Sequence, residues 1–321
     1  MTYLNKQIYQ DAGKALKTLA LEPELRNVFE KSELFRSLLA GPSSRYVLPD
    51  RTDKTISRLL QLRELGYRLG IERVGEEINS WNGVDQYLRE CEQFIATYRP
   101  RHGREMQFGF DLSSLGLNFS SDLAYRNASY LARLCAEKSM TVIFSMERSE
   151  KVPEILQIFF HLAADHSNLA ITLPAQLNRS VEDLPELLKT GVKLRLVKGV
   201  YSEPAEISLA RGYQLDERYL AMVEQIVEYG SRVACATQDP YIIKVLKERG
   251  LIDCIEEVEM LHGVNSGIMG ALRGQDVNTR ITCVYGNNWY LHFLHRLSEN
   301  PENIIMALAD FHNPENIHYD Y

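Results

Sequence analysis

The stretch from Lys193 to Tyr201, KLRLVKGVY, places cations on a strand that is otherwise apolar. Side chains alternate between the two faces of a strand, so Arg195 and Val197 are expected on one face, while Lys198 leaves at the strand end. A cation that points into a protein interior is costly unless it meets an anion or an electron-rich ligand. On the pattern alone two interpretations stay open: a bound ligand of that kind, or an internal salt bridge with a carboxylate from a neighbouring strand.

This stretch is the fifth of eight short β-type runs that alternate with longer helical patterns, as repeated βα units do. The predicted strands are 67–74, 106–112, 141–146, 169–173, 192–198, 232–236, 254–260 and 280–285. Helical patterns between them include 122–138, 151–165, 216–229, 240–249 and 289–297. Eight strands, each followed by a helix, favour a barrel over an open sheet. The predicted fold class is therefore α/β, a (β/α)8 TIM-type barrel.

The region before the first predicted strand is helical in pattern. From residue 6 to about residue 67 the apolar residues recur at helical spacing, as Leu16 and Leu19 do. No low-complexity linker divides the chain. We therefore predict residues 1–66 to be an N-terminal helical segment packed on the barrel, and residues 67–321 to be the barrel itself.

The composition is that of a globular protein with a large core, because 45% of the 321 residues are hydrophobic and 25% are charged. The formal net charge of −7 argues against nucleic acid as a partner, since binding to phosphates needs clustered Lys and Arg, and a small-molecule partner is favoured. The five cysteines contain no CxxC pair and the histidines show no metal-ligand spacing, so no disulfide framework and no metal site are expected. Without a leader segment or a run of eighteen apolar residues, the sequence predicts a cytoplasmic protein whose membrane association is at most peripheral.

Candidate site residues lie where barrel enzymes bind their ligands, at the carboxyl ends of the strands. Neither GxGxxG after a strand nor GxxxxGK[ST] occurs, so a Rossmann turn and a P-loop are not evident. In the helix after the last strand, His292, His295, Arg296 and Glu299 are three or four residues apart and share one face. Such a stripe is usually a solvated surface, but it points at a ligand if this helix caps the barrel mouth. The pattern leaves both possibilities open.

Four segments of the sequence resemble one known family. They are LRLVKGVYSEP, ACATQDP, EVEMLHGV and YGNNWYLHFLHRLSENPEN, in this order. They resemble the RLVKGAY, ATHN, FQMLYG and RRLAENPEN segments of the proline dehydrogenase family, and such an ordered set is far more specific than one short motif. The resemblance implies a distorted (β/α)8 barrel that binds FAD noncovalently at the carboxyl ends of its strands, with the last helix above the flavin.

The residues that this resemblance implies for the cofactor are largely intact. Arg195 matches the arginine near the flavin N5, Lys198 a lysine that contacts the cofactor, and Glu299 a glutamate that supports FAD binding. The histidine of ATHN is Gln238 here, and the family's Gln-Ala-Tyr segment begins with Pro174, which has no amide side chain to bond the flavin pyrimidine. The cofactor-binding residues predicted in this way are Ala175, Arg195, Lys198, Gly199, Thr237, Gln238 and Glu299.

The substrate side departs further from the family. The family holds the proline carboxylate with two adjacent arginines and a lysine from an early strand, which suits charge-assisted bonding. Only the second arginine survives, as Arg296, because the first is His295 and Asp111 stands where the lysine belongs. An aspartate there reverses the charge next to the expected carboxylate. Three more pocket positions differ from the family: Ser145, Thr282 and His292.

Retained flavin residues and a changed pocket indicate an FAD-dependent dehydrogenase or oxidase. It would remove hydride from a carbon beside nitrogen in a small amine or amino-acid derivative other than free proline, and pass the electrons to an acceptor that the sequence does not name. Arg195 would tune the flavin, Arg296 would hold an anionic group, and Asp111 would pair with a cationic or hydrogen-bond-donating part of the substrate. The predicted catalytic residues are Arg195, Asp111, Tyr201, His292, His295 and Arg296.

The two histidines are candidates for proton transfer, because an unperturbed histidine titrates near neutrality, or they have a simple packing role. Two other functions also stay open. One is a genuine L-proline dehydrogenase that forms 1-pyrroline-5-carboxylate in a pocket that tolerates these changes. The other is a barrel that no longer catalyses and acts as a binding protein, since a fold alone does not imply a function.

Overall fold

Nine parallel strands form the sheet of the described residues, and eight of them close into a barrel. The computed structural model describes residues 3–20, 22–75, 78–99, 106–286, 289–299 and 301–321. The strands are β1 (Val47–Leu48), β2 (Arg68–Arg73), β3 (Met106–Phe110), β4 (Met140–Phe144), β5 (Leu169–Pro174), β6 (Lys193–Val197), β7 (Val233–Ala236), β8 (Glu257–Leu261) and β9 (Thr279–Tyr285). Strand β9 pairs with both β2 and β8, which closes the ring. All eight predicted strands are present, and the predicted barrel is confirmed.

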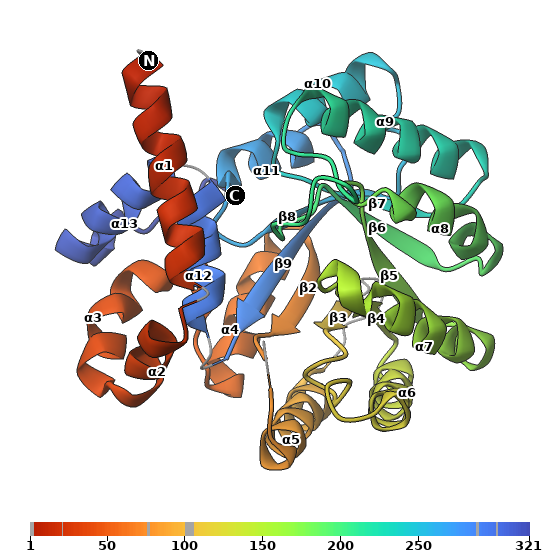
Figure 1. Ribbon diagram of the computed structural model, residues 1–321, viewed down its shortest axis with the longest axis horizontal. Coiled ribbons are helices and arrows are strands. Elements are labelled where there is room, and N and C mark those ends of the chain that lie inside the picture. The colour runs from red at the N-terminus through yellow and green to blue at the C-terminus, as the bar shows by residue number, and fades with distance from the viewer. Residues whose placement is uncertain (1–2, 21, 76–77, 100–105, 287–288, 300) are drawn as a thin grey trace.

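Helices surround the barrel, and a second group of helices lies on one side of it (Figure 1). The helices between strands are α4 (Thr52–Glu64), α5 (Trp81–Thr97), α6 (Ser121–Glu137), α7 (Val152–Asp165), α8 (Arg179–Lys189), α9 (Tyr213–Glu228), α10 (Pro240–Glu248) and α11 (Ser266–Arg273). The group on the left of Figure 1 consists of α1 (Tyr3–Ala20), α2 (Pro23–Lys31), α3 (Glu33–Ser43), α12 (Trp289–Glu299) and α13 (Pro301–His312). Two short 3-10 turns are η1 (Ser149–Lys151) and η2 (Pro314–Asn316).

Strand β6 shows how the strands divide their side chains between the helices and the barrel interior. Leu194 and Leu196 belong to the apolar core that the strands share with the surrounding helices. Lys193 and Arg195 lie on the other face and meet carboxylates of β8, the next strand but one in the barrel. The alternation predicted for this strand is therefore observed, and the interior of the barrel contains charges.

The barrel is distorted at the seam between β8 and β9. These two strands pair only as far as Thr282, although β9 continues to Tyr285. The end of β9 pairs instead with β1, in which Val47 lies opposite Val284. The sequence analysis does not predict this strand, because two residues are too short to show an alternation. The segment before residue 66 thus contributes to the sheet.

The N-terminal helices pack against α12 and α13 through a second apolar cluster. Its buried members are Ala20, Phe29, Tyr46, Val47, Val264, Tyr290, Phe293, Leu294, Leu297 and Ala307. Helices α1 and α12 approach so closely that a Cβ on Gly13 would lie 2.9 Å from the carbonyl oxygen of Ser298. Arg45, just after α3, forms a buried bidentate ion pair with Asp310 of α13, with both N–O distances at 2.7 Å. These contacts join the segment to the rest of the chain, and the domain boundary at residue 66 stays a prediction.

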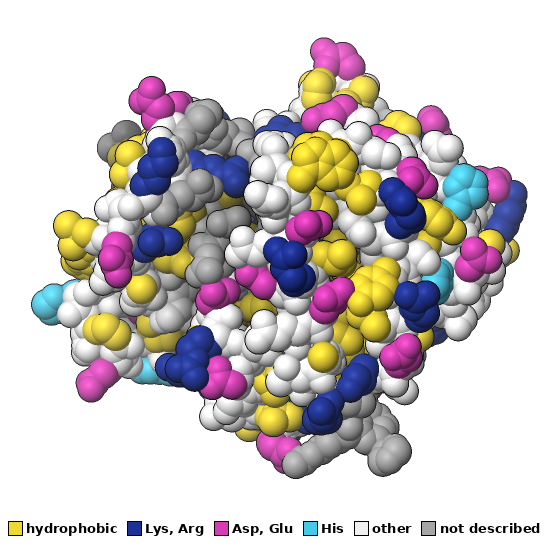
Figure 2. All heavy atoms as spheres, turned by 90° about the horizontal axis from the view of Figure 1, so that it is seen from below, with side chains coloured by type: hydrophobic (Ala, Val, Ile, Leu, Met, Phe, Trp, Pro, Cys, Tyr) yellow, Lys and Arg dark blue, Asp and Glu magenta, His cyan; other side chains and the backbone are white. Residues whose placement is uncertain are grey.

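On the face drawn in Figure 2, acidic, basic and hydrophobic side chains are intermixed. Among the described helices, none is both long enough and apolar enough to cross a membrane.

Candidate active site

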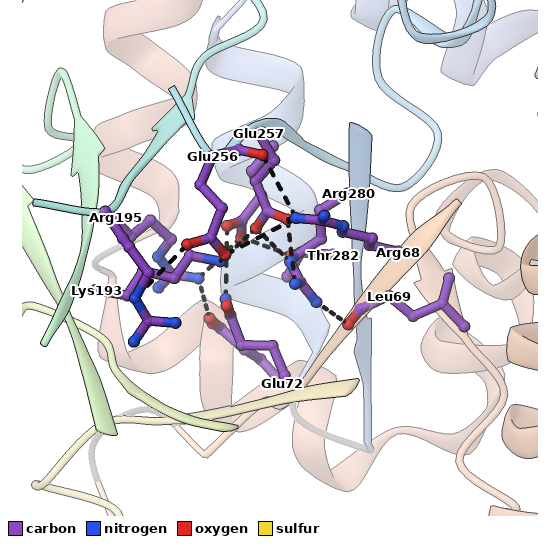
Figure 3. Close-up of polar contacts among 12 residues, drawn as sticks. Arg68, Leu69, Glu72, Lys193, Arg195, Glu256, Glu257, Arg280 and Thr282 are labelled. Atoms are coloured by element: carbon purple, nitrogen blue, oxygen red, sulfur yellow. Dashed lines mark hydrogen bonds and ion pairs between the residues drawn. The ribbon is translucent and has the colours of Figure 1, made fainter. Parts of the chain in front are cut away.

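A layer of buried charges fills the barrel at the amino-terminal ends of its strands (Figure 3). Glu257 lies at its centre and accepts hydrogen bonds from Lys193 Nζ at 2.5 Å and Arg280 Nε at 2.6 Å. A third cation, Arg68, donates to the same carboxylate at 3.0 Å. Burial alone would raise the pKa of Glu257, but Arg280 and Lys193 hold it far below its usual value. Because barrel enzymes bind their ligands at the opposite end, this layer fits a structural role.

A second polar layer surrounds Arg195, nearer the carboxyl ends of the strands. Its Nη1 donates to Glu72 at 2.7 Å and to Glu259 at 3.2 Å. Its Nε donates to Thr172 at 2.9 Å, and its Nη2 donates to Ser145 at 3.0 Å. Burial alone would lower the pKa of the guanidinium, but the two carboxylates raise it above its usual value. Arg195 is thus a permanent cation between two anions, which is the salt bridge left open by the sequence.

This salt bridge does not exhaust the hydrogen-bonding capacity of Arg195. A guanidinium has five N–H donors, and the four hydrogen bonds to described residues leave one donor for a ligand. The two interpretations of the buried cation are therefore compatible.

Glu72 and Glu259 are two site residues that the sequence analysis missed. No sequence pattern connects Glu72 with the site, because its partner Arg195 is 123 residues away in the chain. The family resemblance could have identified Glu259, since the segment EVEMLHGV aligns it with the glutamine of the family segment FQMLYG. Its carboxylate also accepts a hydrogen bond from Thr282 at 2.6 Å and lies 3.5 Å from Gln107 Nε2. A carboxylate thus stands beside Arg195 where the family pattern has a neutral amide.

Lys198 lies between two carboxylates just beyond the end of β6. Its Nζ contacts Asp216 of α9 and lies 2.5 Å from Asp239 Oδ2. Asp239 also caps α10, because its Oδ1 accepts the backbone N–H of Tyr241 at 2.9 Å. Burial would raise the pKa of Asp239, but hydrogen bonds led by that from Lys198 bring it below its usual value. Thr237 accepts the backbone N–H of Asp239 at 3.2 Å, so Lys198 and Thr237 belong to one hydrogen-bonded unit.

The loops after β5 and β6 run together and bring Ala175 close to Gly199. The backbone N–H of Ala175 donates to the carbonyl of Val197 at 2.8 Å. Gly199 has a φ of +111°, and a Cβ at this position would collide with the side chain of Gln176. The amide of Gln176 in turn donates to the carbonyl of Tyr201 at 3.1 Å. A glycine is therefore required here by both its backbone angle and the close approach of the two loops.

The polar stripe of α12 is largely buried. Arg296 Nη2 lies 2.7 Å from Glu299, and the second oxygen of Glu299 accepts a hydrogen bond from Gln238 at 3.0 Å. Arg296 Nε and His292 Nε2 are buried without a hydrogen-bond partner among the described residues. Burial and the nearby Arg296 lower the pKa of His292 far below its usual value and that of His295 to about 4. Both imidazoles are therefore neutral at pH 7.

Asp111 follows the end of β3, and its carboxylate turns into its own loop. Its two oxygens accept hydrogen bonds from the backbone N–H of Ser114 at 2.7 Å and from the hydroxyl of Ser114 at 2.9 Å. Burial and the neighbouring Glu147 raise the pKa of Asp111 to about 7. The nearby Lys151 pairs with Glu147 at 3.1 Å. Asp111 thus stabilises a turn, and its contact with substrate stays a prediction.

Tyr201 lies at the same end of the barrel and faces a cation that the sequence analysis did not select. The guanidinium carbon of Arg148 lies 5.5 Å from the centre of the Tyr201 ring. Arg148 also contributes to the lowered pKa of His295, as Arg296 does. Arg148 thus contacts Tyr201 and also affects the charge of His295 on α12.

Comparison with known proteins identifies the family of this chain. A family model described as proline dehydrogenase matches residues 55–305. This chain belongs to the proline dehydrogenase family. Proline dehydrogenase 2 of Bacillus subtilis (strain 168) is 29% identical to it over 259 residues, covering 79% of this chain and 85% of that protein. Proline dehydrogenase of Deinococcus radiodurans is 25% identical over 306 residues, covering 92% of this chain and 96% of that protein.

The fold is also shared with solved structures. The crystal structure of proline utilization A from Bdellovibrio bacteriovorus, inactivated by N-propargylglycine, aligns with a TM-score of 0.73 at 16% identity. The alignment covers 96% of this chain but 38% of that larger protein. Members of the proline dehydrogenase family are flavin-dependent dehydrogenases that act on a CH–NH donor, and this chain belongs to that enzyme class.

The residues present fit the FAD on which the proline dehydrogenase family depends. Two buried polar atoms of α12, Arg296 Nε and His292 Nε2, have no partner among the described residues. One donor of Arg195 is also open, and Lys198 lies just beyond the end of the same strand. These groups offer a negatively charged, planar cofactor both hydrogen bonds and cations.

Proposed function

We propose that this chain is an FAD-dependent dehydrogenase that oxidises the C–N bond of a small amine or amino-acid derivative other than free proline. The family membership supports the reaction class. The observation that supports a changed substrate is the state of His295, which stands where the family has an arginine. Burial and neighbouring cations lower its pKa to about 4, so the lost arginine is replaced by an uncharged ring near neutrality.

The cofactor would be held by residues of β6 and α12 and of the segments just after β5, β6 and β7. The residues proposed for this are Ala175, Arg195, Lys198, Gly199, Thr237, Gln238 and Glu299. When bound, FAD accepts the hydride from the substrate carbon beside nitrogen. Arg195 supports this by holding a positive charge that is fixed by Glu72 and Glu259.

The substrate would lie between the barrel mouth and the α12 stripe. Arg296 would hold an anionic group of the substrate, with its charge partly offset by Glu299. His292 Nε2, buried and without a partner among the described residues, would accept a hydrogen bond from the substrate nitrogen as a neutral ring, because burial and Arg296 keep its pKa far below its usual value. Asp111 would bind a donor on the substrate, and Tyr201 would pack against it. We further propose that the protein works in the cytoplasm, with membrane contact at most peripheral.

A genuine L-proline dehydrogenase is the second candidate, and the names of the curated relatives from Bacillus subtilis and Deinococcus radiodurans favour it. A noncatalytic binding protein is the third. Binding and reduction of FAD separate both enzymes from a noncatalytic protein, and the substrate that reduces the flavin separates the two enzymes.

The test is anaerobic bleaching of the bound flavin by a panel of amines, amino acids and N-substituted derivatives, with L-proline included. We expect at least one member of the panel to bleach the flavin much faster than proline does. Rapid bleaching by proline, with dye reduction at rates typical of enzymes, would establish the second candidate instead. A colourless protein that does not take up added FAD would overturn both enzymatic functions.

A further inference from the structure

Arg148 is a cation at the barrel mouth for which the structure shows no carboxylate partner. It lies four residues beyond the end of β4, and its guanidinium faces the ring of Tyr201 at 5.5 Å. Arg148 is partly buried, and among the described residues no carboxylate lies within 4 Å of it, whereas the buried cations Lys193, Arg195 and Lys198 each have one. An arginine fixed on an aromatic ring with its N–H groups unpaired can receive a planar anion.

The loop that carries Arg148 is fastened to the loop that carries Tyr201. The next residue, Ser149, donates from its backbone N–H to Glu203 at 3.0 Å and from its hydroxyl to the same carboxylate at 2.6 Å. Both oxygens of Glu203 are thus bonded to Ser149. On the other side of Arg148, Glu147 is held by Lys151 at 3.1 Å. Glu203 and Glu147 are therefore engaged by Ser149 and Lys151, and the loop of Arg148 is bonded to the loop of Tyr201.

The surroundings of Arg148 are cationic. His295 is sensitive to charge here: after burial, its pKa is lowered by Arg296, Lys17 and Arg148, which come from three different parts of the chain. The charge of Arg296 is shared with Glu299, but that of Arg148 is not shared with any described carboxylate. A position where three cations act on one neutral imidazole favours an anion, and Arg148 is held there against the ring of Tyr201.

We propose that Arg148 is a specificity residue that binds the carboxylate of the substrate, in place of the arginine that His295 replaces. The substrate is then an amino acid or another amine with a carboxylate, rather than a simple amine. This inference rests on the proposed function, because it places the substrate at the mouth between Arg148 and Arg296. The positive charge that α12 lost at His295 is then supplied by the loop after β4. This moves the carboxylate of the substrate, and so changes which carbon beside nitrogen faces the flavin.

The test compares a carboxylate with its neutral amide on the purified protein with its FAD. Butyrate and butyramide are titrated into the protein, and the broadening of ligand proton signals in NMR gives each dissociation constant. We expect wild type to bind butyrate more tightly than butyramide. Arg148→Gln should weaken butyrate binding at least tenfold and leave butyramide binding unchanged. Arg148→Lys should recover part of the lost butyrate affinity, because it restores the charge without the planar geometry.

Arg133 provides a matched control, since its guanidinium lies 5.4 Å from the ring of Tyr130 on α6, outside the site. Arg133→Gln should bind both ligands as wild type does. In turnover with whichever amino acid bleaches the flavin, Arg148→Gln should raise KM at least tenfold and change kcat less than threefold. Thermal unfolding of each variant shows whether the fold is kept.

The outcomes separate the inference from the proposed function. Equal butyrate affinity in wild type and Arg148→Gln, or no preference of wild type for butyrate over butyramide, would overturn the role of Arg148 even if the flavin is bleached by an amine. Conversely, a protein that binds butyrate through Arg148 but takes up no FAD would overturn the proposed function and keep the anion site.

Discussion

The side-chain amide of Gln238 donates a hydrogen bond of 3.0 Å to Glu299, and so joins the loop after β7 to the last turn of α12. The family resemblance implies a cofactor role for both positions, yet the sequence holds them 61 residues apart. Glu299 also pairs with Arg296 at 2.7 Å, so one carboxylate connects a strand end to the α12 stripe.

Breaking this connection should weaken FAD binding. Gln238→Leu leaves one oxygen of the partly buried Glu299 without its donor, which costs about 1 to 2 kcal/mol. We expect the dissociation constant of FAD to rise roughly 5- to 30-fold, measured by quenching of flavin fluorescence as FAD is added to apoprotein. Gln275→Leu removes an exposed contact with Lys247 of 2.7 Å and serves as the control. Equal FAD affinity in wild type and Gln238→Leu would show that the connection does not support the cofactor.

Glu259 should lower the reduction potential of a flavin bound beside Arg195. Glu259→Gln keeps an oxygen that can accept from Arg195 and Thr282, but it removes one negative charge 3.2 Å from the guanidinium. By Coulomb's law in a partly polar interior, removing this charge stabilises the reduced flavin by about 1 to 3 kcal/mol. The two-electron reduction potential of the flavin should therefore rise by about 20 to 60 mV. Spectroelectrochemical titration measures it. As a control, Glu224→Gln, at a surface ion pair with Arg249, should leave the potential unchanged. The same potential in Glu259→Gln and wild type would contradict an effect of Glu259 on the flavin.

Asp111 should make the protein less stable as the pH rises. Its folded pKa of about 7 lies above the value of about 3.9 in an unfolded chain. Unfolding therefore releases a proton between about pH 4 and pH 7, so stability falls as pH rises through this window and the penalty is fully present above it. Asp111→Asn keeps an oxygen for the N–H of Ser114 and removes the penalty. We expect the difference in unfolding free energy between Asp111→Asn and wild type to grow by about 2 to 4 kcal/mol, in favour of the variant, as the pH rises from 4 to 8, allowing for partial exposure.

Urea unfolding at several pH values measures this gain. Asp122→Asn, at an exposed pair with Arg126, should show no such dependence. A difference between Asp111→Asn and wild type that does not change with pH would mean that Asp111 is not held in an environment that disfavours its charge.

Glu257 should be essential for stability rather than for activity. Its carboxylate is fully buried between Lys193 and Arg280, so Glu257→Gln removes a buried negative charge that faces two buried cations and leaves Lys193 with Glu256 as its carboxylate partner. Removing one partner of a buried ion pair costs about 3 to 5 kcal/mol, which denaturant unfolding measures. Glu217→Gln, at a surface pair with Arg249, should cost under about 1 kcal/mol. A small loss for Glu257→Gln would show that this layer does not stabilise the barrel.

Local patterns in the sequence were sufficient to predict the repeated βα units. The apolar alternation of β6, with Leu194 and Leu196 between cations, predicts both the strand and the face on which Arg195 lies, because side chains alternate in any strand. The order of four motifs was sufficient to predict the family. The strand β1 was not predictable, since Val47 and Leu48 form a strand only because β9 extends beyond β8.

What the sequence by itself determined is the chemical type of the site: a cation on a barrel strand, a family of flavin enzymes, and a substrate pocket with altered charges. Only the tertiary structure decided which charges meet. Glu72 and Glu259 pair with Arg195 from two other strands of the barrel, Asp111 turns into its own loop, and Arg148 reaches the ring of Tyr201. The physical reason is that electrostatic interactions depend on distance in space and on burial, and neither quantity can be read from positions along the chain.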